Sequence, residues 1–461
     1  MFKLTNSPAE NKMGIMPVNR LLISMSLPMV ISMLVQALYN VVDTIFVSSL
    51  GQDALTALSL AFSLQNLMIA VATGTGVGVN ALLSRSLGAK KFDRANKAAT
   101  NGVFLAMCSA LVFMLVGVFF TRAFFEMFGS SAGVVEYGTQ YLSICCVFSF
   151  GIFGQVIFER LLQATGKTIY SMITQLTGAI INIILDPILI YGYFGFPALG
   201  VAGAAIATVM GQIVAFLCGV YFNFRFNKEI KLEFKNFKPD GQIIGRIYSV
   251  GLPSIAMGSV GSVMNAGINQ IVRICGDVAE TAQAVFGLYF KIQSFIFMPV
   301  FGLNNGMVPI VAYNFGAKKR DRMVKTIKLS VVYACAMMFI GFLVFQIMPD
   351  KLIGLFADSA DVGQLLEIGV PAFRTISISF LFAGFCIVIL SVFQALGHGL
   401  LSLITSLARQ LGALLPVALT LALVTRSVNA IWFAFPVAEI ISVTLSAFFL
   451  VRVYKTQIKN L

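Results

Sequence analysis

The sequence predicts an all-α polytopic membrane protein with twelve transmembrane helices in two six-helix lobes, related by a pseudo-two-fold axis along the membrane normal. Three observations lead to this fold class. Of the 461 residues, 58% are hydrophobic and 11% are charged, whereas soluble chains carry about 25% charged residues. The mean hydropathy is +0.90. The chain contains repeated long apolar stretches, and its two halves share motifs.

Twelve apolar stretches are long enough to cross a bilayer, which takes about 20 helical residues. A polar segment precedes the first of them, and we expect it to form a short cytoplasmic leader without a cleavable signal peptide. The expected spans are 20–46, 54–83, 96–121, 133–157, 168–192, 199–224, 244–272, 280–312, 324–347, 362–392, 400–424 and 428–453.

The distribution of Lys and Arg predicts the orientation of these helices. With a cytoplasmic N-terminus, 25 of the 32 basic residues fall in inner loops and terminal segments, and only Arg122, Arg273, Lys351 and Arg426 fall in outer loops. Cytoplasmic loops are enriched in Lys and Arg. We therefore expect both termini in the cytoplasm and the protein in the inner (plasma) membrane. The net charge of +13 reflects this topology rather than nucleic-acid binding, because no basic patch is interleaved with exposed aromatic residues.

The second half of the chain repeats motifs of the first. LGAKKFDRANKAA at 87–99 returns as FGAKKRDRMVKTI at 315–327, and QATG at 163–166 returns as QALG at 394–397. Six helices per repeat give both halves the same orientation, as in two-lobed transporters. The expected organisation, in a monomer, is a leader at 1–19, an N-lobe at 20–224, a cytoplasmic inter-lobe loop at 225–243, a C-lobe at 244–453 and a cytoplasmic tail at 454–461.

Polar side chains recur at helical spacing in three spans of the N-lobe. Ionisable groups inside a membrane are costly and are by default candidates for function. The residues expected to converge on one cavity are Gln36, Tyr39, Asn40 and Asp43 in the first span, Gln175, Asn182 and Asp186 in the fifth, and Thr208 and Gln212 in the sixth. Two carboxylates with amide and hydroxyl oxygens suit proton exchange or a small hard cation such as Na⁺. The alternative is a polar cluster that only orients helices.

Two further carboxylates are less clearly functional. Glu159 is expected at the cytoplasmic end of the fourth span, as an interfacial group or in a salt bridge with its neighbour Arg160. Glu439 lies within the last span, where either Lys291 or Arg409 is expected to neutralise it. Lys291 itself is a structural counter-ion or part of a substrate-facing cavity surface.

Helix breakers inside spans give two more expectations. Pro28 in the first span either forms a static kink or acts as a hinge whose bending is coupled to the state of Asp43. The string GTGVGVNA at 74–81 resembles a nucleotide-binding loop, but it lies within an apolar span with no preceding strand. It is therefore expected to provide close helix packing.

Taken together, several of these strings resemble those of multidrug and toxic compound extrusion (MATE) transporters. They are NVVDTIFVSSLG at 40–51, SRSLGAKK and AYNFGAKK around the paired turns, QATG and QALG, NIILDPILIYG at 182–192 and GVAGAAIATVMGQ at 200–212. Asp43, Asn182, Asp186 and Thr208 match the N-lobe motif of that family. The seventh span has no acidic residue, which favours the DinF-like or MepA-like bacterial branch.

The resemblance implies a twelve-helix antiporter that exports drugs or toxic organic cations in exchange for H⁺ or Na⁺, with no other cofactor. Asp43 would be the coupling carboxylate, with Asn182, Asp186 and Thr208 as its partners or as Na⁺ ligands. Gln36, Tyr39, Asn40, Gln175 and Gln212 would lie nearby in the cavity.

Two other function classes are weighed against this one. A lipid-linked precursor flippase of the related superfamily would need extra helices and several cationic side chains facing the cavity. An intramembrane enzyme with paired aspartates would need a YD and GxGD arrangement, which is absent, and the single His398 excludes a His-based metal site. We therefore expect a transporter and not an enzyme.

Overall fold

The described part of the protein is built of helices only. The computed structural model describes residues 10–235, 237–355, 362–459 and 461, and all regular elements in these ranges are helical. Residues 1–9 of the expected leader lie outside the described ranges. Within these ranges ten helices are long and apolar enough to cross a membrane, and the number is twelve if each of two bent helix pairs is one span. The protein is a multi-pass membrane protein.

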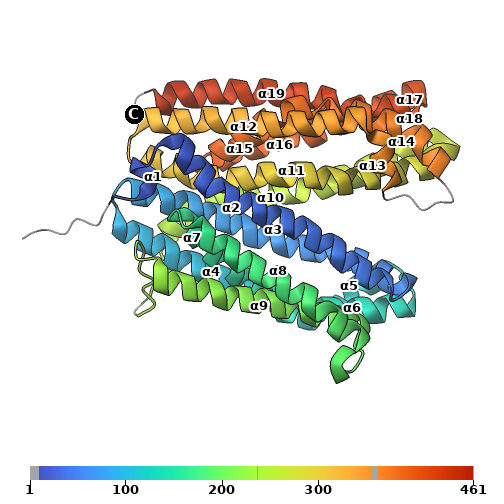
Figure 1. The fold of residues 1–461 in the computed structure, drawn as a ribbon, viewed down its shortest axis with the longest axis horizontal. Helices are drawn as coiled ribbons and strands as arrows, with labels where there is room; N and C mark the ends of the chain where they lie inside the picture. Colours follow the sequence, from blue (N-terminus) through green and yellow to red (C-terminus); the bar gives the residue numbers. More distant parts are fainter. Residues whose placement is uncertain (1–9, 236, 356–361, 460) are drawn as a thin grey trace, which may run out of the picture.

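The helices form two lobes that follow the two halves of the sequence (Figure 1). The N-lobe contains α1 (Lys12–Ile15), α2 (Val18–Ser48), α3 (Gln52–Gly88), α4 (Phe92–Phe119), α5 (Thr121–Met127), α6 (Ala132–Val147), α7 (Phe150–Ala164), α8 (Thr168–Tyr191), η1 (Tyr193–Gly195) and α9 (Gly200–Phe226). The C-lobe contains α10 (Gly241–Val272), η2 (Arg273–Val278), α11 (Ala279–Gly316), α12 (Arg320–Ile347), α13 (Pro349–Gly354), α14 (Val362–Ser377), α15 (Phe380–Ala395), α16 (Gly399–Leu407), η3 (Ala408–Leu414), α17 (Leu415–Thr425), α18 (Val428–Ile431), α19 (Ala434–Val453) and η4 (Tyr454–Ile458).

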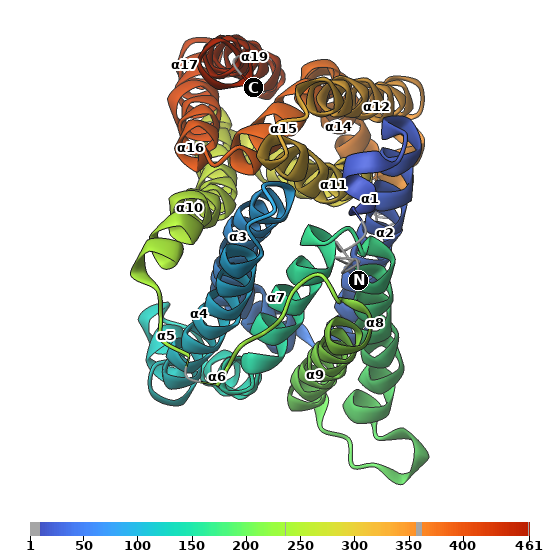
Figure 2. The same cartoon turned by 90° about the vertical axis from the view of Figure 1, so that its left-hand side faces the viewer.

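The lobes meet along two helix pairs, α2 with α11 and α3 with α10 (Figure 2). Glycine makes this contact close. A Cβ atom on Gly78 of α3 would lie 2.2 Å from the backbone oxygen of Ile247, and one on Gly302 of α11 would lie 2.5 Å from the Cα of Val30. The glycine-rich string at 74–81 is therefore a helix-packing surface, as expected, because small residues let helix backbones approach one another.

The internal repeat is visible in backbone detail. The amide of Lys91 donates to the oxygen of Ser86 at 2.9 Å, and the amide of Lys319 donates to the oxygen of Asn314 at the same distance. The preceding lysines, Lys90 and Lys318, both adopt a positive φ, 56° and 57°. The helices α3 and α11 therefore end in the same way, 228 positions apart. In both, the second residue after the helix is a lysine in the left-handed conformation.

Two expected spans are broken where the sequence predicts a single helix. The span at 133–157 is divided into α6 and α7, which meet at 45°, and the span at 362–392 is divided into α14 and α15, which meet at 49°. Neither break contains a proline. The breaks fall next to Ser149 and Ser379, whose hydroxyls donate to the backbone oxygens of Ala110 and Ile376.

The segment that connects the lobes is bound to α4 through its own backbone amides. The amides of Lys231, Glu233 and Asp240 donate to side-chain oxygens of Asn96, Thr100 and Asn101. The Asp240 carboxylate then caps α10 by accepting from the amides of Ile243 and Gln242, and these bonds lower the pKa of Asp240.

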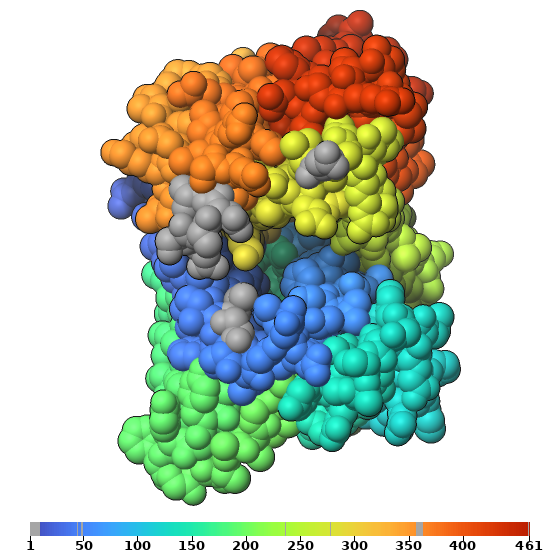
Figure 3. Space-filling view, turned by 90° about the vertical axis from the view of Figure 1, so that its right-hand side faces the viewer, coloured from blue at the N-terminus to red at the C-terminus, as the bar shows by residue number. Residues whose placement is uncertain are grey.

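The two ends of the molecule differ. The helix α1 and the C-terminal end of the chain lie at one end (Figures 1 and 2). At the opposite end the surface is hollowed between the N-lobe, in blue, and the C-lobe, in yellow (Figure 3). The lobes are thus packed together near α1 and separated at the other end.

Candidate functional site

The N-lobe contains a cavity of about 250 Å³ between α2, α3, α6, α7, α8 and α9. It brings together the predicted polar residues of three helices. Those that line it are Gln36, Tyr39, Asn40, Asp43, Gln175, Asn182, Thr208 and Gln212. Asp186 lies one turn beyond Asn182 on α8 and is fully buried behind the cavity wall.

Close packing of α8 on α9 positions the centre of this site. A Cβ atom on Gly211 would lie 2.6 Å from the backbone oxygen of Gly178, so the two helices approach closely at this point. The approach allows the Asn182 amide to donate to the Thr208 hydroxyl at 3.2 Å. Residues 26 positions apart in the sequence are thereby joined within one polar cluster.

Several oxygens of the cluster have no hydrogen-bond donor in the part of the chain that the structure describes. Within the described residues, no donor reaches the buried oxygens Asp43 Oδ1, Asp186 Oδ1 and Oδ2, Asn182 Oδ1 and Gln175 Oε1. Nearly all buried polar atoms in proteins have a partner. Carboxylate, amide and hydroxyl oxygens are also the ligands that hard cations prefer. The set therefore fits a bound proton or a small cation, although no group of three His, Cys, Asp or Glu side chains lies together in the described ranges.

Glu159 belongs to this cavity, and the expectation of an interfacial group or a salt bridge is wrong. Its side chain is buried, accepts from Gln155 Nε2 at 3.0 Å and lines the N-lobe cavity. Arg160 instead donates to Gln163 at 2.8 Å and across the lobes to Asn305 at 2.9 Å. Adjacent helical residues point in different directions, so sequence neighbours do not form the pair.

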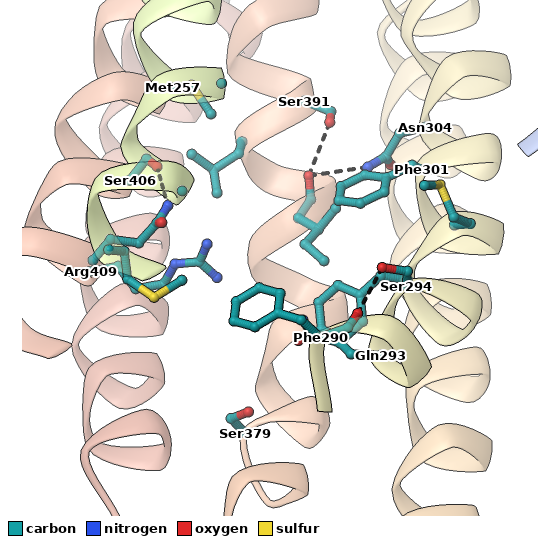
Figure 4. Close-up of a pocket in the computed structure, with 18 of the residues that line it drawn as sticks. Met257, Phe290, Gln293, Ser294, Phe301, Asn304, Ser379, Ser391, Ser406 and Arg409 are labelled. Atoms are coloured by element: carbon teal, nitrogen blue, oxygen red, sulfur yellow. Dashed lines mark hydrogen bonds between the residues drawn. The ribbon is translucent and has the colours of Figure 1, made fainter. Parts of the chain in front are cut away.

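A larger cavity, of about 680 Å³, lies mainly in the C-lobe between α10, α11, α15, α16, η3 and α19, and residues of α2, α3 and α7 also line it (Figure 4). The sequence did not predict this cavity, because its polar residues are spread thinly over many elements. Those that line it are Thr73, Arg160, Tyr289, Gln293, Ser294, Asn304, Asn305, Ser379, Ser391, Gln394, Ser406, Arg409, Gln410 and Glu439. Arg160, Met33 and Thr73 line both cavities.

Arg409, rather than Lys291, neutralises Glu439. The Arg409 Nη1 atom lies 3.0 Å from Glu439 Oε1. Lys291 is exposed on α11 and lines neither of the two cavities, whereas Phe290 and Gln293 beside it line the C-lobe cavity. The expected cavity position of Lys291 is wrong because each residue is rotated by about 100° along a helix.

Pro28 lies inside α2, which continues through it without interruption. The helix therefore lacks one backbone donor at this point. The hinge expected at Pro28 stays a prediction.

Two lobes of membrane-spanning helices, each with a polar cavity at its centre, define a polytopic membrane protein of the two-lobed transporter class. The MatE family model matches residues 28–188 and 252–420, which correspond to the two halves of the repeat. The chain belongs to the MatE family.

Curated and solved proteins agree with this assignment. The chain is 27% identical over 428 residues to "Multidrug export protein MepA" of Staphylococcus haemolyticus (strain JCSC1435), which covers 92% of this chain and 91% of that relative. It superposes with a TM-score of 0.92 on the structure described as "Crystal structure of MATE in complex with MaL6", at 23% identity over 99% of this chain and 100% of that one. For "Outward-facing conformation of a multidrug resistance MATE family transporter of the MOP superfamily" the TM-score is 0.91, at 24% identity and the same coverage.

Proposed function

We propose that this protein is a secondary active multidrug efflux antiporter, which exports organic and often cationic compounds in exchange for H⁺ or Na⁺. The observation that carries the proposal is the cluster of buried oxygens without donors in the N-lobe. Such a cluster is stabilised when a proton or a cation binds to it. Membership of the MatE family and the name of the staphylococcal relative, a multidrug export protein, support drug export.

The orientation we propose places both termini in the cytoplasm of a monomer in the inner membrane. Most Lys and Arg lie in loops on one side of the predicted spans, and such loops are cytoplasmic as a rule. With this orientation, the hollow between the lobes opens to the outside (Figure 3).

The mechanism that we propose is alternating access. In the outward-open state Asp43 and Asp186 take up H⁺ or Na⁺, with Asn182 and Thr208 as partners of the ion. The helix α2 then bends near Pro28, and the bound compound leaves to the outside. After the lobes rock to the inward-open state, the ion departs and a new compound binds.

The test is dye export from proteoliposomes that contain the purified protein. We expect Asp43→Asn to abolish ion-driven export of a fluorescent cationic dye. The amide can neither bind a proton at neutral pH nor supply a negative charge for Na⁺. The matched control is Asp350→Asn, which makes the same change at an exposed position of α13. Export at the wild-type rate by Asp43→Asn would refute the coupling role.

The same vesicles identify the coupling ion. A Na⁺ gradient and a pH gradient are imposed separately, and export under one of them alone names the ion. No export under either gradient would contradict secondary active transport.

The flippase alternative has weaker support. It predicts more than twelve spans, whereas the described residues contain at most twelve.

A further inference from the structure

The ion pair in the C-lobe cavity is unequally buried. The Glu439 side chain is 5% exposed, whereas that of Arg409 is 26% exposed. Glu439 holds the guanidinium through Nη1, and Figure 4 shows Arg409 on one wall of the cavity, opposite Phe290, Gln293 and Asn304. A molecule in the cavity therefore meets the cation of the pair more readily than the carboxylate.

The two cavities differ in the charge of their walls. The charged residues that line the C-lobe cavity are Arg160, Arg409 and Glu439, so arginines outnumber acids. Those that line the N-lobe cavity are Asp43, Glu159 and the shared Arg160, so acids outnumber arginines. Arg160 donates to the amide oxygens of Gln163 and Asn305, and within the described ranges it forms no salt bridge with a carboxylate.

The backbone around Arg409 is a π-helical turn, which is uncommon in proteins. Arg409 and Gln410 lie on η3, a π-helical turn inserted between α16 and α17. Such turns add a residue to a helix and occur frequently at functional sites. Here Gln410 donates to Ser406, so that the amide supports the same wall.

Three buried polar atoms of residues that line the cavity have no partner in the described structure. Arg409 Nε, Gln293 Oε1 and Asn304 Oδ1 are buried and have no partner among the described residues. A carboxylate is the planar acceptor that fits a guanidinium. The Gln293 and Asn304 oxygens on the opposite wall are buried, and a rotation of either side chain toward the cavity would let it accept from an N–H or O–H group of the same ligand.

The rest of the cavity is suited to an aromatic body. Phe290, Phe297 and Phe301 line it from α11, and Met257 and Met264 line it from α10. Aromatic rings stack on flat ligands, and methionine adapts to ligands of different shape. The volume of about 680 Å³ is within the range of cavities that hold drug-sized molecules.

We propose that the C-lobe cavity binds the exported compound, and that it selects aromatic compounds with a carboxylate, which lies against Arg409 while the rings lie among the phenylalanines of α11. Zwitterions whose other end is cationic belong to this class. The inference rests on the proposed export function, and it separates the ligand from the coupling ion, which is assigned to the N-lobe.

The test uses two dyes that share one xanthene ring. Rhodamine 110 carries a free carboxylate, and rhodamine 123 is its methyl ester. We expect the purified protein to bind rhodamine 110 more tightly by fluorescence polarisation. The double variant Arg409→Gln/Glu439→Gln removes the guanidinium charge without leaving an unpaired acid. It should lower the ratio of the rhodamine 110 affinity to the rhodamine 123 affinity about tenfold. Arg374→Gln makes the same exchange at an exposed site of the C-lobe and should leave the preference unchanged.

A second variant keeps the ion pair intact. Ser294 lines the same cavity from α11 (Figure 4), so Ser294→Asp introduces a carboxylate that repels rhodamine 110 and attracts rhodamine 123. We expect the order of affinities to reverse. An unchanged preference in the folded double variant or in Ser294→Asp would overturn the proposal.

The two proposals fail in different ways. If Asp43→Asn exports dye at the wild-type rate while the binding preference depends on Arg409, ion coupling in the N-lobe is wrong and the C-lobe site stands. If ion-driven export needs Asp43 but the dye preference is unchanged when Arg409 is replaced, the C-lobe site is wrong and the proposed function stands.

Discussion

At the scale of single residues, the N-lobe site includes a hydrogen bond between α8 and α9 beside several oxygens without donors among the described residues. Asn182 donates to Thr208, which leaves the Asn182 oxygen and both Asp186 oxygens without donors in the described structure. The hydroxyl thus fixes the orientation of the amide, and the amide oxygen stays available as an acceptor. Such an arrangement favours binding of a positive species.

The hydroxyl can be removed with little change of shape. In Thr208→Val the Asn182 amide loses its acceptor, at a cost of about 1–3 kcal/mol for a buried group, and it is free to rotate. We expect a weaker apparent affinity for the coupling ion, measured as the ion dependence of dye export. Thr177→Val on α8 is the control, because Thr177 bonds only to the backbone of Ile173 and lines neither cavity. Equal ion dependence in both variants would contradict the role of Thr208.

At the scale of elements, the helix α2 connects the site to the lobe interface. It carries Asp43 in its second half, and Pro28 lies within the part of α2 that packs on α11, between Ser26 and Val30. A missing backbone donor makes a helix easier to bend at that point.

Replacement of this proline tests the hinge. Pro28→Ala restores the backbone donor, so we expect slower ion-driven export with dye binding retained. Pro349→Ala is a suitable control, because Pro349 is the first residue of α13, where no helical donor is needed. An export rate equal to that of Pro349→Ala would show that Pro28 is a static feature.

A second element, α1, joins the two lobes at their closed end. Asn11 donates to the backbone oxygen of Thr165 in the N-lobe at 3.0 Å. Asn314 and Arg322 of the C-lobe donate to the backbone oxygen of Met13. Lys319 also pairs with Glu10 and donates to the oxygen of Gly14.

The contact of α1 should depend on pH. A hydrogen bond from Lys319 and its charge lower the pKa of Glu10 below its ordinary value. A carboxylate with a lowered pKa stabilises the folded state above its ordinary pKa, about 4.3 for Glu, and this stabilisation is lost as the pH falls through the lowered value.

Hydrogen exchange at residues 12–16 measures this dependence. At neutral pH we expect stronger protection in the wild type than in Glu10→Gln, and the difference should vanish in acid. A constant difference across the pH range would show that the Glu10 charge does not hold α1.

At the scale of the whole molecule, the repeat makes the lobes contact each other reciprocally. A Cβ atom on Gly88 would lie 1.9 Å from the oxygen of Tyr313, and one on Gly316 would lie 2.1 Å from the oxygen of Arg85. Both glycines and both contacted residues are 228 positions apart, so each lobe presents the same surface to the other. The pseudo-two-fold axis therefore passes through this contact.

The reciprocity predicts paired effects. Gly88→Ala and Gly316→Ala should both separate the lobes at this end. They should lower the free energy of unfolding by similar amounts, about 1–3 kcal/mol for an overpacked site. Gly241→Ala is the control, because no atom lies within 4 Å of an added Cβ there. A stable Gly88→Ala with an unstable Gly316→Ala would contradict a symmetric contact.

Much of the fold could be predicted because its signals are local. Hydropathy identified twelve spans, and the motif at 87–99 and 315–327 identified the repeat. Helical spacing also predicted that Asp43, Asn182 and Thr208 share a cavity. By contrast, the breaks at Ser149 and Ser379 have no proline to predict them, because the bend depends on bonds to neighbouring turns and helices.

The sequence by itself determined the class of protein, the number of spans and the helix faces that carry polar groups, since hydropathy and helical period act along one chain segment. Only the tertiary structure decided which charges meet. It paired Glu439 with Arg409 instead of Lys291, buried Glu159 in the N-lobe cavity and assembled the C-lobe cavity from many elements. These outcomes depend on the rotation of each helix and on packing between distant segments, and no local pattern in the sequence specifies either of them.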